Sequence, residues 1–285
     1  MRRWTERSKT LTDSIHTLRS RGRCGVFKTV EGNTMRLVST LKKSLPMSQR
    51  LRWNVMRSKA TGEKELAYVN ALCDQSCVSL DIGANRGVYS YLMRQHSWSV
   101  IAFEPNPFYA NFVRRALKDV KVIEAAVSDH EGTSVLRVPL SEPIAGMGTI
   151  EAENTLDQVP VQQIAISLLT LDSLKLTKIG FMKIDVEGHE LAALRGATWT
   201  IENSLPNLLI EAEERHRKDA VASVLGFLSE YGYAGLFHVN GKLHPIEEFD
   251  ASTHQDASMS GKPYVNNFIF IHKSKMAQFH PALRN

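Results

Sequence analysis

Short apolar runs rich in β-branched residues alternate with segments of helical periodicity from residue 78 onward. Such runs favour buried strands, and the intervening segments favour the helices that connect parallel strands. The predicted strands are 78–82, 99–103, 120–126, 179–186, 207–211, 233–239 and 267–272. The pattern therefore predicts an α/β fold: a doubly wound, mostly parallel seven-stranded sheet with helices on both faces.

Helices are predicted where apolar residues recur every three or four positions. The connecting helices are 88–96, 108–117, 190–204 and 219–231, with a short helical segment at 170–174. Two further helical patterns precede the first strand, a basic one over 34–59 divided by Pro46 and another over 62–72. The α/β domain is expected to span 61–275, followed by a tail, 276–285.

Residues 133–167 interrupt this alternation. Residues 134–140 and 159–166 favour strands, whereas 142–158 are polar and contain Gly146, Met147 and Gly148. We expect an inserted hairpin beside the active site that contacts the substrate. A polar loop is predicted from 240 to 265.

The first predicted strand runs directly into a glycine-containing turn, in the sequence VSLDIGANRG over 78–87. Gly83 and Gly87 bracket this turn, where the backbone adopts unusual angles or approaches a ligand. Asp81 interrupts the apolar run and therefore needs a function or a partner. The spacing D-x-G-x-N-x-G, which includes Asn85, is typical of a nucleoside-binding α/β domain and differs from the G-x-G-x-x-G of dinucleotide sites. The alternative is a turn whose glycines serve only the backbone.

Acidic side chains also follow the second and third strands. Glu104 lies 21 residues beyond Gly83, where nucleoside-binding folds place the carboxylate that binds both ribose hydroxyls. We assign Asn106, in the same proline-rich turn, to the same site. Val127 would offer an apolar face to adenine, and Asp129 either contacts the adenine amine or only starts the turn at 130–132.

Five acidic residues share one position in the predicted fold, the carboxyl end of a strand. They are Asp81, Glu104, Asp129, Asp185 and Glu211. Ligands of open α/β sheets bind outside the carboxyl ends of the strands. This coincidence is stronger evidence for a site than any one motif.

The sequences IDVEGHE (184–190) and LRGA (194–197) closely resemble the hallmark of the FkbM-type family of class I S-adenosylmethionine-dependent methyltransferases. Four further stretches fit the same family: LDIGANRGVYS (80–90), FEPNP (103–107), TLDSL (170–174) and NNFIF (266–270). The resemblance covers about 63–273. It implies the Rossmann-like class I methyltransferase fold, with helix 62–72 expected to cover the entrance to the cofactor cleft.

The resemblance also implies methyl transfer from S-adenosylmethionine, usually to oxygen, and hence an acceptor hydroxyl on a sugar, glycan or small natural product. We expect Asp185 to act as the base or to orient the substrate, with Glu187 and His189 as further candidates and Glu211 positioning the substrate. Glu187 could instead be an acid favoured at a helix start, and His189 a solvent-facing residue. No ligand spacing compels a metal, so none is predicted.

Charge is distributed unevenly along the chain. Residues 1–60 contain 15 of the 35 Lys and Arg but only 3 of the 30 Asp and Glu, which gives this leader a net charge of +12. We expect it to be partly disordered and partly helical. Because such a leader can bind nucleic acid, an RNA methyltransferase is an alternative, although not the favoured one. An organelle transit peptide is a second possible use.

The sequence restricts the other function classes. No apolar run is long enough to span a bilayer and no signal-peptide core is present, so a cytoplasmic protein is expected, with organelle targeting left open. A non-catalytic interaction protein on the same fold is the remaining alternative. It is disfavoured because Asp81, Gly83, Glu104 and Asp185 are all present. An NAD-dependent oxidoreductase is less consistent with the glycine spacing.

Overall fold

A computed structural model describes residues 45–61, 63–140, 148–151, 154, 156, 159–256, 258, 264–277 and 279. The chain divides into two compact units, Met1–Pro46 and Met47–Asn285. The predictions for the leader up to residue 44, for Gly146 and Met147, and for most of the tail lie outside the described residues. The description below therefore concerns the second unit.

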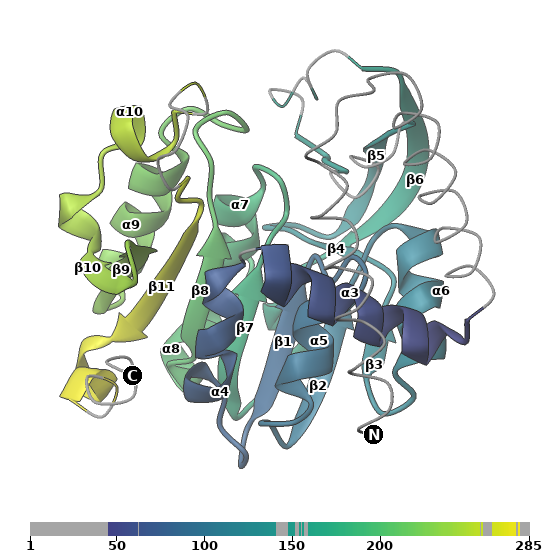
Figure 1. Ribbon diagram of the computed structural model, residues 1–285, viewed down its shortest axis with the longest axis horizontal. Helices are drawn as coiled ribbons and strands as arrows, with labels where there is room; N and C mark the ends of the chain where they lie inside the picture. The colour runs from purple at the N-terminus through teal and green to yellow at the C-terminus, as the bar shows by residue number, and fades with distance from the viewer. Residues whose placement is uncertain are drawn as a thin grey trace, which may run out of the picture. The chain divides into compact units, whose positions relative to one another are not determined.

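The main sheet of this unit is built mostly from the predicted strands. They are β1 (Val78–Ile82), β2 (Ser99–Phe103), β3 (Lys121–Ile123), β7 (Ile179–Ile184), β8 (Asn207–Glu211), β9 (Tyr233–Val239), β10 (Lys242–Pro245) and β11 (Asn267–His272). The order is β10-β9-β11-β8-β7-β1-β2-β3 (Figure 1). The five strands β8, β7, β1, β2 and β3 pair in parallel with one another, whereas β11 is antiparallel to both of its neighbours. The predicted α/β class is confirmed.

Two parts of the strand prediction need correction. Residues 242–245, predicted as loop, form the eighth strand, because Asn240 and Gly241 adopt positive φ and close a two-residue hairpin between β9 and β10. The predicted third strand is divided as well. Only Lys121–Ile123 joins the main sheet, and Ala126–Val127 (β4) pairs with a second sheet.

The second sheet contains three strands in the order β4-β6-β5. Its long pair, β5 (Gly132–Pro139) and β6 (Val161–Leu169), is antiparallel over its whole length and lies within the region expected to contain an inserted hairpin. Apolar side chains on one face of this pair, Leu136, Val138, Ile166 and Leu168, pack together with Ala126. The small sheet thus has its own core and is tied to the end of β3 through β4.

Helices cover both faces of the main sheet (Figure 1). One group comprises α3 (Met47–Thr61), η1 (Lys64–Tyr68), α4 (Val69–Leu72), α5 (Val88–Met93) and α6 (Pro107–Ala116), and the other α7 (Glu190–Arg195), α8 (Thr198–Ser204) and α9 (Ala220–Glu230). Alternate residues of β8 show the division: Leu208 and Ile210 join the core of the second group, whereas Leu209 joins that of the first. The remaining short elements are η4 (Asp172–Leu174), η5 (Ile246–Glu248), α10 (Ala251–His254) and η6 (Lys273–Lys275).

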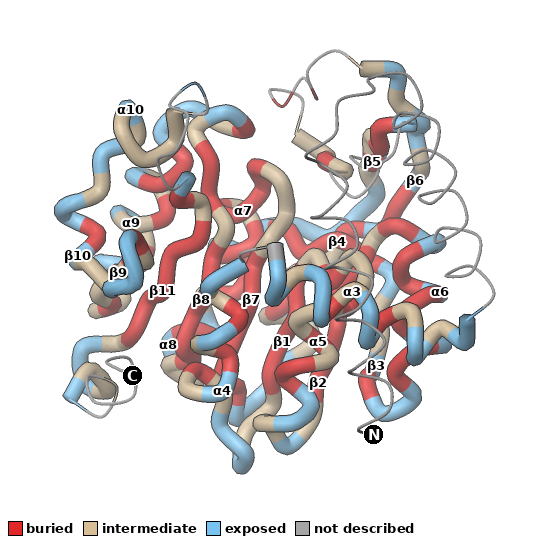
Figure 2. The backbone as a smooth tube through the Cα atoms, in the orientation of Figure 1, coloured by how far each residue is buried: buried red, intermediate tan, exposed pale blue. Residues whose placement is uncertain are grey.

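The central strands β1, β7, β8 and β11 are buried along most of their length (Figure 2). Because β1, β2, β7 and β8 are parallel, their carboxyl ends meet at one edge of the sheet. The strand order reverses between β1 and β7. Along the chain, the sheet grows from β1 through β2 to β3 on one side, and from β7 to β8 on the other side. This is the position at which open α/β sheets bind ligands. Within the described part of the chain, no helix is long and apolar enough to cross a membrane.

Candidate active site

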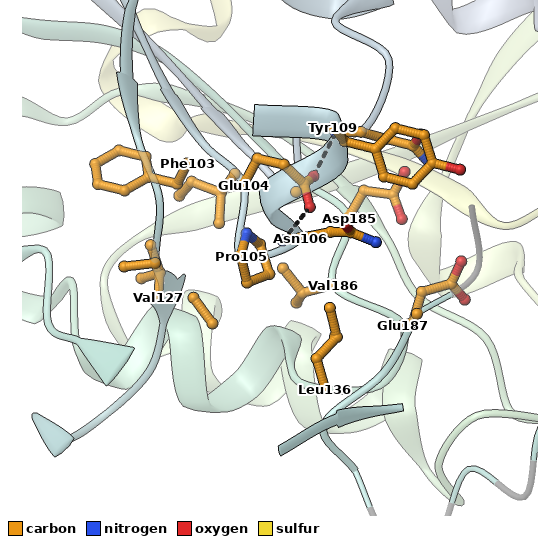
Figure 3. Close-up of a pocket in the computed structure, with 16 residues that line it drawn as sticks. Phe103, Glu104, Pro105, Asn106, Tyr109, Val127, Leu136, Asp185, Val186 and Glu187 are labelled. Atoms are coloured by element: carbon orange, nitrogen blue, oxygen red, sulfur yellow. Dashed lines mark hydrogen bonds between the residues drawn. The ribbon is translucent and has the colours of Figure 1, made fainter. Parts of the chain in front are cut away.

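A cavity opens at the carboxyl ends of β1, β2 and β7, beside β4 and β5 of the small sheet (Figure 3). It contains about 580 Å³ of empty space, a figure that includes open solvent at its mouth. Seven of the twelve predicted site residues line it: Gly83, Asn85, Glu104, Asn106, Val127, Asp185 and Glu187. The predicted edge of the sheet therefore carries a cavity that most of the predicted site residues line.

Gly83 forms part of the cavity wall where β1 and β7 end. The Asp185 amide donates a hydrogen bond to the Ile82 carbonyl over 3.0 Å, which draws the two strand ends together. A Cβ on Gly83 would lie 1.8 Å from the Asp185 carbonyl oxygen, and its φ is +81°. Only glycine fits this position, because both the close approach and the backbone angle exclude a side chain.

Glu104 follows β2 and turns its carboxylate toward the cavity (Figure 3). Its two oxygens accept backbone hydrogen bonds, Oε2 from Asn85 over 2.6 Å and Oε1 from Asn106 over 2.8 Å. Burial raises the pKa of Glu104 to about 7, although these two hydrogen bonds oppose the rise. Each carboxylate oxygen has a second lone pair, so the group can still accept hydrogen bonds from two ligand hydroxyls.

The remaining cavity wall combines polar and apolar groups. Asn106 caps α6 by accepting a hydrogen bond from the Phe108 amide, and Pro107 occupies the first helical position, so this turn is rigid. Val127 and Leu136 face the polar side chains from the opposite side of the cavity (Figure 3). A carboxylate with free lone pairs on one side and an apolar surface on the other fits the ribose and adenine of the predicted S-adenosylmethionine.

Three predicted cofactor residues lie outside the cavity wall. The Asp81 carboxylate is buried and accepts two hydrogen bonds from Ser90, from the amide over 2.8 Å and from the hydroxyl over 2.5 Å, and burial raises its pKa to about 6. Gly87 begins α5 with φ +73° and packs close to Val113. Asp129 is partly exposed and contacts His130 over 2.7 Å. Asp81 and Gly87 therefore hold the turn that carries Asn85. Asp129 lies in the loop between β4 and β5.

A charged group of three residues adjoins the cavity at the ends of β7 and β8. Lys183 Nζ lies 3.6 Å from Asp185 Oδ2 and 3.8 Å from Glu211 Oε2. Asp185 lines the cavity with 31% of its side chain exposed, and Glu211 is 22% exposed. Glu211 also accepts a hydrogen bond from Asn266 over 2.7 Å. The two predicted carboxylates are thus brought together, and Lys183 is a residue that the sequence reasoning missed.

The other two predicted catalytic residues are held by contacts with distant parts of the chain. Glu187 has a positive φ of +54°, and its carboxylate lies 3.1 Å from His216 Nε2. Burial and the neighbouring charge of Asp185 raise the pKa of Glu187. Its carbonyl oxygen accepts hydrogen bonds from Thr149 over 2.8 Å and from Asn154 over 3.1 Å. The insertion therefore contacts the turn directly after Asp185.

His189 is buried, so its alternative placement as a solvent-facing residue is wrong. Its Nε2 lies 2.9 Å from the Ser128 hydroxyl, and its Nδ1 forms a close ion-pair contact with Glu151. The side chain thus bridges the end of β4 and the insertion and is not part of the cavity wall. The sequence analysis missed both of these partners, since neither has a recognisable spacing from His189.

The described residues contain no preformed set of metal ligands. No group of three or more His, Cys, Asp or Glu side chains with metal-binding geometry occurs among the described residues. Instead, the carboxylates near Asp185 contact Lys183, His216 and Asn266. What the arrangement offers chemically is a cavity-facing carboxylate with a buried cation behind it.

Sequence comparison identifies one family. The family model described as the methyltransferase FkbM domain matches residues 81–234, more than half of the chain, and includes Glu104, Asp185 and Glu211. None of the curated proteins has a significantly similar sequence.

Three solved structures illustrate the similarity at low identity. A methyltransferase FkbM from Methylobacillus flagellatus KT is 17% identical with a TM-score of 0.45. The match covers 84% of this chain but only 59% of that one, so the present chain spans about three-fifths of its length. An rRNA methylase from Streptococcus thermophilus is 10% identical, with a TM-score of 0.42 and coverage of 74% and 95%. A precorrin-6y C5,15-methyltransferase from Geobacter metallireducens GS-15 is 15% identical, with a TM-score of 0.40 and coverage of 75% and 89%. TM-scores this low give no information about the acceptor.

Proposed function

Because the chain belongs to the FkbM methyltransferase family, whose methyl donor is S-adenosylmethionine, we propose that it methylates a hydroxyl oxygen of a neutral, hydroxyl-rich acceptor. A sugar, a glycan or a small natural product fits this description. The observation that carries the proposal is the Asp185 carboxylate, which lies on the cavity wall at the switch point of the strand order.

The cofactor end of the cavity is assigned to residues that the sequence already suggested, together with Leu136, which the structure adds to the cavity wall. Glu104 would bind the ribose hydroxyls, Val127 and Leu136 would face the adenine, and the turn from Gly83 to Asn85 would approach the methionine end. When bound, S-adenosylmethionine supplies a methyl group that its sulfonium makes electrophilic. The protein must then mainly align the acceptor and remove its proton.

Asp185 is proposed to perform the proton transfer. As the acceptor oxygen forms its bond to the methyl carbon, the bond from that carbon to sulfur breaks and S-adenosylhomocysteine leaves. The hydroxyl proton passes to the Asp185 carboxylate, which balances the reaction. Its position between the cavity and the buried Lys183 supports this role, because the carboxylate is accessible on one side and electrostatically held on the other.

The charge around Asp185 favours a neutral acceptor over a polyanionic one. Four carboxyl groups lie at this edge, those of Asp185, Glu187, Glu211 and Glu213. The cations beside them are already paired: Lys183 with Asp185 and Glu211, and Arg215 with Glu213. A nucleic-acid phosphate would therefore find neither Lys183 nor Arg215 free to pair with it. Carboxylates are instead suitable acceptors for the hydrogen bonds of several hydroxyl groups.

The test is a screen for methylated product with the full chain. S-adenosylmethionine carrying a trideuterated methyl group is incubated with neutral oligosaccharides, simple polyols and natural-product alcohols, and products are detected by mass spectrometry. We expect a product heavier by one labelled methyl, with the label on oxygen in its fragmentation spectrum. Asp185→Asn, which keeps the size of the side chain, is the matched control and should give no product.

The screen also separates the alternatives. Label incorporated into RNA, with binding lost at higher salt, would support the RNA methyltransferase instead. Helix α3 gives that alternative one favourable feature, because its sequence contains four basic and no acidic residues. Failure of the chain to bind S-adenosylmethionine would support the non-catalytic interaction protein. Label on nitrogen or carbon of a small molecule would contradict the proposed oxygen chemistry.

A further inference from the structure

Lys183 is a buried cation on the central strand β7, and the proposed reaction so far uses it only for its contact with Asp185. Its side chain is 1% exposed, and the strand around it is apolar. An ammonium group is costly to bury unless carboxylates or other acceptors surround it. The identity of those acceptors therefore indicates what the lysine does.

The acceptors around Lys183 include the two carboxylates at the ends of β7 and β8. Its Nζ lies between Asp185 at 3.6 Å and Glu211 at 3.8 Å, and 3.4 Å from the Ile184 carbonyl oxygen. The Tyr89 ring, 5.1 Å from Nζ, covers it from α5. The lysine thus bridges the ends of β7 and β8 from inside the protein.

The sheet geometry explains why these carboxylates need a cation. Lys183 lies on β7 and Asp185 directly follows the last residue of that strand, and their contact of 3.6 Å places the two side chains on the same side. Ile184 pairs with Ile210, which places Asp185 and Glu211 at neighbouring positions one step further along. Neighbouring parallel strands are about 4.8 Å apart, so two unpaired negative charges here would repel strongly. Lys183 lies where it offsets that repulsion.

We propose that Lys183 is a positioning residue for methyl transfer, which holds the carboxyl groups of Asp185 and Glu211 together at the cavity edge where the acceptor hydroxyl binds. This inference rests on the proposed function. In it, Asp185 takes the acceptor proton and Glu211 helps to orient the acceptor hydroxyl.

The pKa shifts of Lys183 and Glu211 agree with a direct interaction among Lys183, Asp185 and Glu211. Burial and then the charge of Asp185 raise the pKa of Glu211 well above its usual range, while Lys183 opposes the rise. Burial alone would lower the pKa of Lys183, but the charges of Asp185 and Glu211 outweigh burial and raise it. The other titratable groups that act on Lys183 or Glu211 are Asp81 on β1, Tyr89 on α5, Glu63 before η1, Glu65 within η1, and Glu187 and Glu213.

The experiment measures thermal unfolding of the full chain from pH 5 to pH 8, with Lys183→Met made in two backgrounds. In the natural sequence, the decrease in Tm caused by Lys183→Met should become larger as pH rises. Without the cation the folded-state pKa of Glu211 rises further, and a carboxyl with a raised pKa loses stability as pH increases. We expect the loss at pH 8 to exceed that at pH 5 by at least about 5 °C.

In the second background, Asp185→Asn with Glu211→Gln, the effect of Lys183→Met on Tm should no longer be a decrease. Lys183 is then a buried charge without these partners, so Lys183→Met should leave Tm unchanged or raise it. An equal, pH-independent loss in both backgrounds would show that the lysine only fills space and would overturn the inference. If Lys183→Met fails to fold in the natural sequence, folding of the triple variant supports the inference and its failure contradicts it.

Cofactor affinity provides the readout that separates this inference from the proposed function. The dissociation constant of S-adenosylhomocysteine for Lys183→Met, measured by calorimetry at pH 6, should remain within about threefold of the unmodified chain, because Lys183 does not line the cavity. A loss of more than tenfold would contradict a role confined to the acceptor side. Neither measurement requires an acceptor, so an unsuccessful product screen would leave this test intact.

Discussion

The two sides of the cavity are held together in different ways. On the cofactor side, at the ends of β1 and β2, polar groups are satisfied locally: Glu104 by the amides of Asn85 and Asn106, and Asp81 by Ser90. On the acceptor side, at the ends of β7 and β8, the contacts join distant segments. Glu211 contacts Asn266, Glu187 contacts His216, and the carbonyl of Glu187 binds Thr149 of the insertion.

This difference suggests a division of labour. A site built from the two turns that follow neighbouring strands depends on few parts of the chain and can be kept while the rest of the fold varies, which suits a constant ligand. A site assembled from several loops can change with any of them, which suits a variable acceptor. The predictions below test whether the two sides are separable.

The largest expected effect is on methyl transfer in Asp185→Asn. The change removes the proposed base but keeps the size of the side chain, so turnover should fall by at least about 10³-fold, to an undetectable level. Product formation at saturating S-adenosylmethionine measures it. Glu214→Gln is a suitable control, because Glu214 carries a carboxyl group of the same region but binds the amides of Asp219 and Val221 and does not line the cavity. Normal turnover in Asp185→Asn would show that the base is another residue.

The next effect is on stability, at the glycine where the two sides meet. Gly83→Ala would place a methyl group 1.8 Å from the Asp185 carbonyl oxygen, so the strand ends would have to separate. We expect a loss of about 3 kcal/mol or more in the free energy of unfolding, measured with urea. In Gly226→Ala, on α9, the added methyl group meets open space and should stabilise the helix by up to about 1 kcal/mol. Equal effects of the two changes would contradict the close approach.

Cofactor affinity should respond next, through Glu104. Replacement by Gln removes a charged hydrogen-bond acceptor and should weaken S-adenosylhomocysteine binding by about 30-fold. Because burial raises the pKa of Glu104 to about 7, the unmodified chain should also bind more weakly as pH falls from 8 to 6. The sign for the unliganded chain is opposite: a carboxyl with a raised folded-state pKa loses stability as pH rises through 7. Affinity of Glu104→Gln should be independent of pH over this range.

The smallest effect is expected at Asp129. Its side chain is partly exposed and contacts His130 and Ser128, not the cavity. Asp129→Ala should therefore change the dissociation constant of S-adenosylhomocysteine by less than about twofold. A tenfold loss would instead place this carboxylate at the adenine amine, the other role that the sequence suggested.

The same division explains what could be predicted from the sequence. The turn from Asp81 to Gly87 and the position of Glu104 follow from local signals: an apolar run, two glycines and a proline-rich stop. Lys183 could not be recognised in this way, because its partner Glu211 is defined only by the pairing of β7 with β8. A lysine within an apolar strand was nevertheless a signal that a partner must exist.

Longer-range contacts were still less accessible. His189 reaches Glu151 and Ser128, which lie 38 and 61 residues away, and no spacing rule connects them. Strand β10 was missed for a different reason. Its signal, the two-residue turn at Asn240 and Gly241, was present but was read as part of a polar loop.

The most direct test of the division compares Asp185→Asn and Glu104→Gln in one experiment, with calorimetric binding of S-adenosylhomocysteine and methyl transfer at saturating S-adenosylmethionine. The predicted result is reciprocal. Asp185→Asn should bind within about threefold of the unmodified chain but not transfer the methyl group, whereas Glu104→Gln should bind weakly yet retain most of its transfer at saturation. Loss of binding in Asp185→Asn as large as its loss of transfer would contradict the separation of the two sides.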